Sequence, residues 1–337
     1  MRVGIIGTGA IAHKHAQVYA NIGYSLVACA ASDPARARAF ADRYGCAAAT
    51  SWQDLCRADL DIVDVCRFPD FRLPVVELCA REKKHVQVEK PIATNTETAR
   101  RMIDVARGAG ILLNVVSQHR FDESAQFLKR AIDAGRLGKR IEADAYVKWY
   151  RPPEYYARPA KGSWAVEGGG ALINQGIHQA DLLLWLVGPV ARVTGEWQLG
   201  AAHRIESEDV VNAVLRYASG ATGVIQASTA FRPGFAERLE FHGTRGTAVI
   251  TGDQLTVWDV DDDGGEPPPL ARAAASGASE PMAISLVPFE RQFLDFGEAI
   301  RAGRQSLVSG EEGYRALELV ESIYRSCREG TPITIQR

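Results

Sequence analysis

The sequence predicts two domains: an N-terminal α/β domain with a doubly wound parallel sheet, then a domain with a large, mostly antiparallel open sheet. The chain has 337 residues, more than one hydrophobic core usually supports. Strand-like runs and helical stretches alternate in its first third, and strand-like runs dominate much of the remainder. We place the domains at residues 1–120 and 121–337.

The first domain shows several βαβ units in a row, the pattern of a doubly wound fold. Apolar periodicity and turn residues bound each element. Strands are predicted at 2–7, 25–30, 61–66, 84–88 and 111–116, and helices at 10–22, 34–44, 71–83 and 94–109.

The second domain contains strands with clear alternation. In "VVNAVLRY" every second residue from Val211 to Tyr217 is apolar, whereas Asn212 and Arg216 are polar, and the turn Ser219–Gly220 leads into "GVIQAST". Helices are predicted at about 122–134, 168–187, 289–302 and 310–328, and a long strand at about 140–150. Residues 261–281, rich in Pro, Gly and Ala, predict a surface loop, with a lid or a subunit contact as the alternative.

Composition and charge are those of an ordinary globular protein. Hydrophobic residues make up 46% of the chain and charged residues 24%, and the formal net charge is -2. Because no basic run stands out, we expect neither a nucleic-acid nor a membrane-surface partner. The first residues enter a strand without a secretory signal, and no apolar run reaches the ~18 residues of a membrane span. We therefore expect a cytoplasmic protein.

Cysteine and histidine spacing gives no indication of a metal site. The six cysteines form no CxxC pair and no zinc-type pattern, so we expect them to be mostly core residues. His13 and His15 are two positions apart on a predicted helix and point to different faces. No metal is expected.

The run "VGIIGTGAIA" predicts a dinucleotide site of the Rossmann type. Gly7, Gly9 and Ala12 form the pattern G-x-G-x-x-G/A between a strand and a helix. Gly7 allows a tight turn, Gly9 lets the backbone approach a pyrophosphate, and Ala12 allows the helix to pack closely on the strand. The helix N-terminus supplies amides and a positive dipole end.

The end of the second strand indicates which dinucleotide is used. Ala31 occupies the position where an acidic residue would bind the free ribose hydroxyl of NAD, and Ser32, Arg36 and Arg38 follow it. Asp33, directly before Pro34, is better explained as a helix N-cap. Serine and arginine suit a 2'-phosphate, so the sequence favours NADP, or use of both cofactors.

A polar stripe lies within the apolar run "GGGALINQGIHQADLLLWLV". Asn174, His178 and Asp181 have helical offsets of 0, 4 and 7, which place them on one face and allow them to face a common cleft. The alternative is a satisfied polar seam within the core. Asp181 would either orient His178 or pair with a basic neighbour. The glycines 168–170 are expected to let backbone and ligand approach closely.

With "EKP" at Glu89–Pro91 added to these runs, the chain resembles the glucose-fructose oxidoreductase, inositol dehydrogenase and MocA family. The resemblance covers nearly the whole length and includes "VSQHRFD", "VKWYR" and "HGTRG". It implies an NAD(P)-dependent enzyme that oxidises or reduces a secondary alcohol of a sugar, cyclitol or related compound. It also implies a homodimer or homotetramer that pairs through the open sheet.

The resemblance assigns Lys90 as the active-site lysine and His178 as the proton-transferring histidine, and it implies a cis bond before Pro91. Asn174 departs from the aspartate of many members; an asparagine subgroup with "NQGIH" acts on nucleotide sugars or glycosides. "CRFPDF" also departs from the family, because threonine and proline are commoner than Arg67 and Phe68.

Loss of a hydride from a secondary alcohol requires loss of the hydroxyl proton as well. An imidazole, with an ordinary pKa near ~6.5, needs less adjustment than an amine to accept that proton at neutral pH. We therefore expect His178 to accept the proton and Lys90 to polarise the same oxygen, with the reverse assignment open.

The predicted site falls into three overlapping sets. The catalytic set is Lys90, His178 and Asn174. The cofactor-binding set is Gly7, Gly9, Ala10, Ile11, Ser32, Arg36, Cys66, Glu89 and Lys90. The substrate-binding set is Lys90, Arg120, Lys148, Tyr150, Trp164, Asn174, His178 and Asp181, in which Tyr150 and Trp164 fit the core equally well.

The predicted function is hydride transfer between nicotinamide and a secondary alcohol of a sugar, glycoside, nucleotide sugar or cyclitol, with C3 as a candidate carbon. One alternative is a lyase that oxidises a sugar carbon transiently, cleaves a glycoside and restores its retained NAD. A second is a non-catalytic regulator that senses the cofactor.

Overall fold

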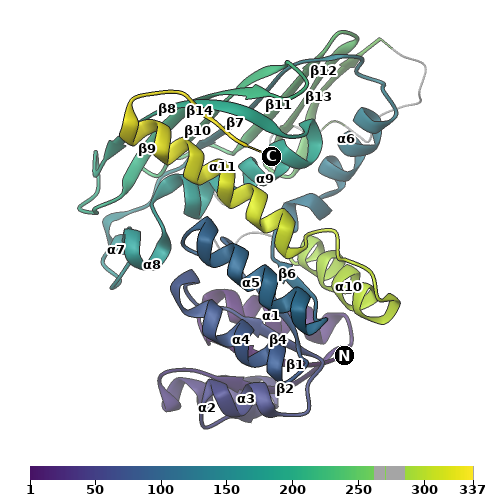
Figure 1. The fold of residues 1–337 in the computed structure, drawn as a ribbon, viewed down its shortest axis with the longest axis vertical. Helices are drawn as coiled ribbons and strands as arrows, with labels where there is room; N and C mark the ends of the chain where they lie inside the picture. The colour runs from purple at the N-terminus through teal and green to yellow at the C-terminus, as the bar shows by residue number, and fades with distance from the viewer. Residues whose placement is uncertain (262–269, 271–284, 337) are drawn as a thin grey trace. The chain divides into compact units, whose positions relative to one another are not determined.

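The computed structural model describes residues 1–261, 270 and 285–336 (Figure 1). It divides into two compact units. Unit 1 comprises Met1–Gln118 with Ser285–Tyr314, and unit 2 comprises His119–Ile284 with Arg315–Arg337. The predicted loop 261–281 lies outside the described residues apart from positions 261 and 270, so its role stays a prediction. Among the described helices, none combines the length and the apolar character that crossing a bilayer requires.

Unit 1 is built on a parallel sheet of six strands in the order β3-β2-β1-β4-β5-β6. Because the chain moves outwards in both directions from the centre of this sheet, the domain is doubly wound, as predicted. The strands are β1 (Arg2–Ile6), β2 (Ser25–Ala30), β3 (Ala47–Ala48), β4 (Ile62–Val65), β5 (His85–Val88) and β6 (Leu113–Val115). The helices are α1 (Ala10–Asn21), α2 (Pro34–Tyr44), α3 (Trp52–Arg57), η1 (Pro69–Phe71), α4 (Arg72–Arg81) and α5 (Thr96–Ala109).

Local sequence signals set the ends of α2. The Asp33 carboxylate accepts a hydrogen bond from the Ala35 amide at 2.9 Å, and Pro34 occupies the first helical position, which confirms the predicted N-cap. Gly45 ends the helix with φ 66° in the left-handed region, where a residue without a Cβ is unstrained. The predicted bounds, 34–44, match the observed helix.

Two short elements between α2 and β4 were not predicted. β3 has 2 residues and α3 has 6, so neither is long enough to show a periodic pattern. A local signal for α3 was nevertheless present, because Ser51 caps this helix and its Oγ accepts from the Asp54 amide at 3.0 Å.

Helix α10 (Val287–Ala302) belongs to unit 1, so the predicted second domain of 121–337 is wrong for this segment. The reason is packing between residues that are far apart in sequence. The Phe293 ring meets His15 edge-on at 4.9 Å and lies 5.0 Å from Tyr19. The Phe289 ring lies 5.8 Å from His15. The apolar side of α10 therefore covers α1.

Unit 2 contains an eight-stranded sheet in the order β13-β12-β11-β7-β10-β9-β8-β14. β7 and β10 pair in parallel and the other neighbours pair antiparallel, so the prediction of a mostly antiparallel open sheet is confirmed. The strands are β7 (Arg140–Lys148), β8 (Val190–Leu199), β9 (Glu208–Tyr217), β10 (Thr222–Ser228), β11 (Arg238–Gly243), β12 (Gly246–Thr251), β13 (Gln254–Val260) and β14 (Ile333–Thr334).

The alternation predicted for β9 is also confirmed. Val211, Leu215 and Tyr217 are buried, whereas Asn212 and Arg216 are exposed. The remaining helices of the chain are η2 (Gln118–Phe121), α6 (Glu123–Asp133), α7 (Pro153–Tyr156), α8 (Trp164–Glu167), η3 (Leu172–Gly176), α9 (Ile177–Val187) and α11 (Gly310–Glu329).

The apolar run 168–187 is not one α-helix, which corrects the prediction. Gly168 ends α8 with φ 82°, and Gly169 has φ 149°, so the backbone leaves the helical region at both residues. The chain then forms one π-helical stretch, η3, before the regular helix α9 begins at Ile177. Single π-helical turns of this kind are frequent at functional sites.

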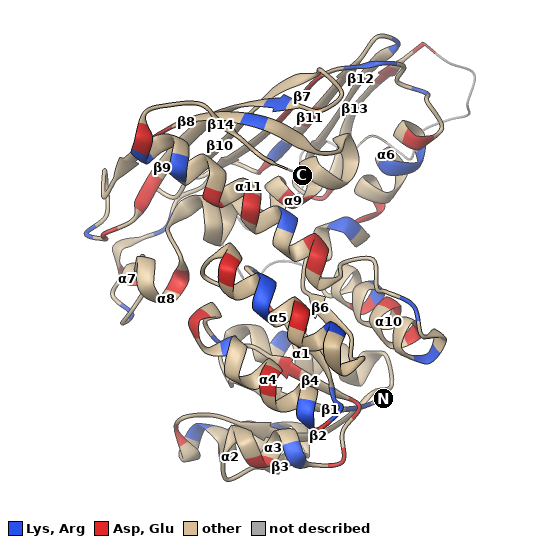
Figure 2. Cartoon of the chain, in the orientation of Figure 1, with Lys and Arg blue, Asp and Glu red and all other residues tan. Residues whose placement is uncertain are grey.

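Charges of both signs share the same helices. Figure 2 shows acidic and basic residues interspersed along α5, α10 and α11. Within unit 1, Arg107 on α5 pairs with Asp104 at 3.2 Å and with Glu311 at 2.9 Å. Exposed pairs of this kind contribute little to stability, so the fold depends mainly on its buried contacts.

We predict that Phe293→Ala destabilises unit 1 by about 3–5 kcal/mol, because it removes a buried ring that packs on α1. Thermal and denaturant unfolding would measure the loss. Leu294→Ala on the same helix is the control, since Leu294 is 38% exposed. Equal effects of the two substitutions would contradict the packing role that we assign to Phe293.

Candidate functional site

The predicted dinucleotide loop connects β1 to α1. Gly7 has φ 101°, and a Cβ there would lie 2.6 Å from the Cys66 carbonyl oxygen, so a side chain is excluded. A Cβ on Gly9 would instead meet no described atom within 4 Å. This open space lies beside the first amides of α1, which have no partner within the helix. The loop therefore fits a pyrophosphate, as its sequence predicts.

The residues after β2 lie next to this loop. Ala31 takes the place of the acid that would bind a ribose hydroxyl, and Ser32 and Arg36 are exposed. The Arg36 guanidinium donates to the Thr8 carbonyl oxygen at 3.4 Å, which brings a positive charge to the loop. These residues can hold the adenosine end of a dinucleotide.

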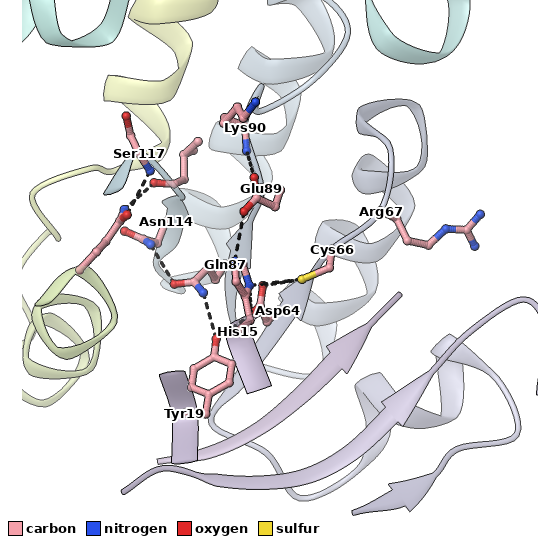
Figure 3. A network of polar contacts seen from close by, with 12 residues as sticks. His15, Tyr19, Asp64, Cys66, Arg67, Gln87, Glu89, Lys90, Asn114 and Ser117 are labelled. Atoms are coloured by element: carbon pink, nitrogen blue, oxygen red, sulfur yellow. Dashed lines mark hydrogen bonds and ion pairs between the residues drawn. The ribbon is translucent and has the colours of Figure 1, made fainter. Parts of the chain in front are cut away.

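A buried cluster around His15 lies beneath the carboxyl ends of β4 and β5 (Figure 3). The Nδ1 of His15 lies 2.8 Å from Asp64 Oδ2, and its Nε2 lies 3.1 Å from Glu89 Oε1. Cys66 Sγ lies 3.2 Å from the same Nδ1. Donor atoms of His15, Asp64 and Cys66 lie within 4.8 Å of one another, a grouping that could hold a metal, but their separations are those of hydrogen bonds.

Electrostatics favour a charged imidazole in this cluster. Burial alone would lower the pKa of His15, but the neighbouring Cys66 and the Asp64 carboxylate raise it well above the ordinary value. Burial also raises the pKa of the Cys66 thiol to about 12, although the neighbouring His15 lowers it. Both ring nitrogens of His15 can then donate, one to each carboxylate.

The cluster continues across the sheet as a chain of polar contacts (Figure 3). The Tyr19 hydroxyl donates to Asp64 at 2.8 Å, and the Gln87 amide donates to the Tyr19 oxygen at 2.9 Å. The Asn114 amide donates to Gln87 at 3.1 Å, and Ser306 donates to Asn114 at 2.8 Å. All these groups are buried and satisfied, which rigidifies the edge that carries the loop.

Glu89 and Lys90 follow β5 at the same edge of the sheet as the dinucleotide loop. Glu89 Oε2 accepts from the Lys90 amide at 3.2 Å. The buried Arg72 guanidinium donates to the carbonyl oxygens of Glu89 and Pro91, which fixes the backbone on both sides of Lys90 in the sequence. The Lys90–Pro91 bond is cis, which the resemblance implied.

In unit 2, η3 and α9 carry the predicted polar stripe. The Asn174 amide donates to the carbonyl oxygens of Gly169 at 3.2 Å and Gly170 at 3.1 Å. The His178 ring meets the His119 ring edge-on at 5.0 Å. Both Asn174 and His178 are partly exposed, so they are accessible from solvent.

Asp181 pairs with a basic neighbour, which was one of the two predicted alternatives. Its carboxylate accepts two hydrogen bonds from Arg120, at 2.8 and 2.6 Å, and both side chains are buried. Such a bidentate pair in a low dielectric is rigid. It brings two predicted substrate contacts together, with their charges directed at each other.

Sequence comparison places the two units in one family. Residues 1–117 match the model described as "Oxidoreductase family, NAD-binding Rossmann fold", and residues 125–249 match the "GFO/IDH/MocA C-terminal domain". The chain belongs to the Gfo/Idh/MocA family. It is therefore an oxidoreductase with an NAD-binding Rossmann domain.

Relatives in this family match along the whole chain. An inositol 2-dehydrogenase of Rhizobium meliloti is 30% identical over 344 residues, which cover 99% of each chain. A D-glucoside 3-dehydrogenase of Escherichia coli is 26% identical over 99% of this chain and 97% of its own. The WlbA dehydrogenase of Bordetella pertussis, solved in complex with NADH and UDP-GlcNAcA, is 30% identical with a TM-score of 0.88, covering 100% of this chain and 99% of its own.

Lys148, another member of the predicted substrate set of this Gfo/Idh/MocA chain, lies apart from His178. Lys148 pairs with Ser228 in the sheet, so its side chain lies on the face opposite Val147 and Ala227. α9 packs on β7, and Gly176 of η3 approaches Ala227, so the helices cover that other face. The pleat of β7 therefore separates Lys148 from His178.

The two aromatic residues of the predicted substrate set have partners within unit 2. The Tyr150 hydroxyl accepts from Arg232 at 2.7 Å. The Trp164 ring lies 5.2 Å from Tyr324 and 5.6 Å from Trp197, in an aromatic cluster. Trp164 is only half-buried, so both interpretations, core and pocket, stay open for it.

Arg67, where the sequence departs from the family, lies beside Phe71 and the dinucleotide loop. Its guanidinium lies 4.1 Å from the centre of the Phe71 ring, and its Cγ would lie 3.0 Å from a Cβ on Gly7. The side chain therefore borders the dinucleotide loop. Cation and ring hold each other in place.

Sequence reasoning missed the roles of His15, Asp64 and Arg72. One signal was available: Asp64 is a charged residue in the strand run "DIVDVC", which packs on both faces of a parallel sheet. A carboxylate there requires a partner, and a histidine on the neighbouring helix is a natural candidate.

We predict that His15 stabilises unit 1 most strongly at low pH. Because its folded-state pKa is raised, the stabilisation is fully present below about pH 6.5 and is lost as the pH rises through the higher folded pKa. The unfolding midpoints of the wild type and His15→Gln should therefore differ more at about pH 6 than at about pH 9. A difference that stays constant over this range would refute a charged His15.

Proposed function

We propose that the protein transfers a hydride between a nicotinamide dinucleotide and a secondary alcohol of a sugar, glycoside, nucleotide sugar or cyclitol, with C3 as a candidate carbon. One observation carries the proposal: Lys90 follows β5 at the sheet edge that also holds the Gly7–Gly9 loop. The activities named for the relatives from Rhizobium meliloti and Escherichia coli support the substrate class.

The proton is the part of this reaction that side chains must handle. When bound, the nicotinamide accepts or returns the hydride. We assign His178 as the group that accepts the hydroxyl proton in oxidation, because imidazole titrates near neutral pH. Lys90 donates a hydrogen bond to the same oxygen, and the reverse assignment is the alternative. In reduction both groups donate to the carbonyl oxygen.

The remaining predicted contacts take different roles in this proposal. Asn174, fixed to the carbonyl oxygens of the glycine loop, contacts the substrate beside His178. The Arg120–Asp181 pair supports this region rather than binding substrate, since the two charges satisfy each other. Lys148 lies on the sheet face opposite Val147 and Ala227, so it is outside the site that we propose.

We further propose a homodimer or homotetramer that pairs through the open face of the unit 2 sheet. On this face Val214 is 57% exposed and Val257 is 38% exposed, although β-branched apolar residues are usually covered.

The small-molecule partner is a carbohydrate. A cytoplasmic location and the lack of nucleic-acid or membrane partners stay expectations from the sequence.

Turnover of a defined panel tests the function. We expect reduced nicotinamide to form when the protein is incubated with NAD or NADP and myo-inositol, an alkyl glucoside or a UDP-sugar uronate. Lys90→Ala should lower kcat at least about a hundredfold while dinucleotide affinity persists, because positioning and proton transfer each contribute roughly this much.

The two alternatives give different results in the same assays. Glycoside cleavage without net reduction, with cofactor retained by the protein, would indicate a lyase. Unchanged behaviour of Lys90→Ala would indicate a cofactor-sensing regulator. Absence of turnover with every compound in either direction would refute the dehydrogenase proposal.

We propose NADP, or both cofactors, as the dinucleotide, since Ala31 replaces the usual acid and Arg36 borders the loop. Arg36→Ala should lower kcat/KM for NADP about 10- to 100-fold, the value of a charge-assisted hydrogen bond, and change NAD use little. Arg43→Ala, in the last turn of the same helix, is the control. A preference of the wild type for NAD by roughly a hundredfold would overturn this proposal.

A further inference from the structure

We propose that Glu208 and Tyr324 are positioning residues that fix the start of the helix carrying Asn174 and His178. This inference rests on the proposed function, in which those two side chains meet the substrate. Glu208 is the first residue of β9, and Tyr324 lies on α11, so both come from elements outside the helix itself. Both belong to unit 2.

The two side chains bind three backbone amides at the beginning of η3. Glu208 Oε2 accepts from the Gly170 amide at 2.7 Å, and its Oε1 accepts from the Leu172 amide at 2.8 Å. The Tyr324 hydroxyl accepts from the Ile173 amide at 3.1 Å and donates to Glu208 Oε1 at 2.7 Å. One hydroxyl therefore joins the carboxylate to the helix.

These contacts suit the chemistry of a helix start. The first amides of a helix lack partners within it, and a negative charge near them is favourable. α9 has no side-chain cap of its own within the described residues, because η3 leads into it directly. Glu208 and Tyr324 supply, from a strand and from another helix, what an N-cap residue usually supplies.

The glycines before η3 leave room for this contact, and the expectation that they also let a ligand approach stays a prediction. A Cβ on Gly169 would lie 2.6 Å from the Tyr324 hydroxyl oxygen. A Cβ on Gly170 would lie 1.8 Å from the Glu208 carbonyl oxygen. Any side chain at either position would push the loop away from Glu208 and Tyr324.

Burial makes the arrangement rigid. Glu208 is 0% exposed and Tyr324 is 2% exposed, and the Tyr324 ring packs against Trp164 and Trp197. Burial raises the pKa of Glu208 to about 7, although the Tyr324 hydroxyl and the loop amides lower it. A buried carboxyl group whose partners are two amides of one loop and the Tyr324 hydroxyl indicates a positional role.

The consequence for the reaction follows from geometry. Asn174 lies within the π-helical stretch, and His178 follows in the first turn of α9, so both move with the backbone at 170–173. A misplacement of about 1 Å at a reacting group can reduce the rate about a hundredfold. Loosening the loop should therefore lower kcat more than it lowers dinucleotide binding.

The test compares Tyr324→Phe with Tyr217→Phe. Tyr217 is also buried, and its hydroxyl donates only to the Ala143 carbonyl oxygen of the sheet, at 3.1 Å, among the described contacts. With the panel compound that is turned over fastest, Tyr324→Phe should lower kcat roughly 10- to 100-fold and leave KM for the dinucleotide unchanged. Tyr217→Phe should keep kcat within about twofold.

A second measurement does not depend on turnover. Hydrogen exchange of the peptide that contains Gly170–Ile173 should speed up in Tyr324→Phe and stay unchanged in Tyr217→Phe. Glu208→Gln, which retains one acceptor oxygen, is the second variant and should show the same exchange change. Unaltered exchange in both, or equal kinetic losses in the two tyrosine variants, would overturn the inference.

A double mutant separates this inference from the proposed function. If Tyr324 acts through His178, adding Tyr324→Phe to His178→Asn should lower kcat no further. If His178→Asn alone retains full turnover, the proposed role of His178 fails, while the exchange experiment still tests the anchoring of the loop.

Discussion

The structure of unit 1 depends on the burial of one histidine between two carboxylates. His15 reaches from α1 to Asp64 on β4 and Glu89 after β5, and no solvent reaches its ring. Two buried carboxylates side by side would repel each other, but a cation between them reverses the sign of that interaction. The helix that begins at the dinucleotide loop is thereby joined to the segment that carries Lys90.

Unit 2 uses buried carboxylates in a related way, with backbone amides in place of a cation. Glu208 accepts from amides of the glycine loop, and the next residue, Asp209, accepts from those of Ala201 and Ala202 at 2.8 Å. Glu208 and Asp209 are the first two residues of β9, so the start of this strand fixes both the glycine loop and the loop at Ala201–Ala202. Loops fixed in this manner present side chains with little freedom, which is what a site that must orient a substrate requires.

The candidate site was predictable where chemistry is encoded in neighbouring residues. Gly7 and Gly9 have local requirements that a short motif expresses, and so does the Asp33–Pro34 cap. Contacts between distant residues were not predictable. His15 and Glu89 are 74 positions apart, and Arg120 and Asp181 are 61 apart, so no local pattern links them. The position of Lys148 was not predictable for another reason. Alternation along a strand defines two faces, but it does not say which of them a helix covers.

By itself the sequence determined the order and type of most elements and the nucleotide loop, because periodicity, caps and glycine requirements act within a few residues. Only the tertiary structure decided that α10 packs on unit 1, that glycines 169 and 170 make room for Tyr324 and Glu208, and that Asp181 binds Arg120. These outcomes depend on which buried group lies nearest once the chain has folded, and the requirement that each buried polar group be satisfied selects among the partners that the fold brings within reach.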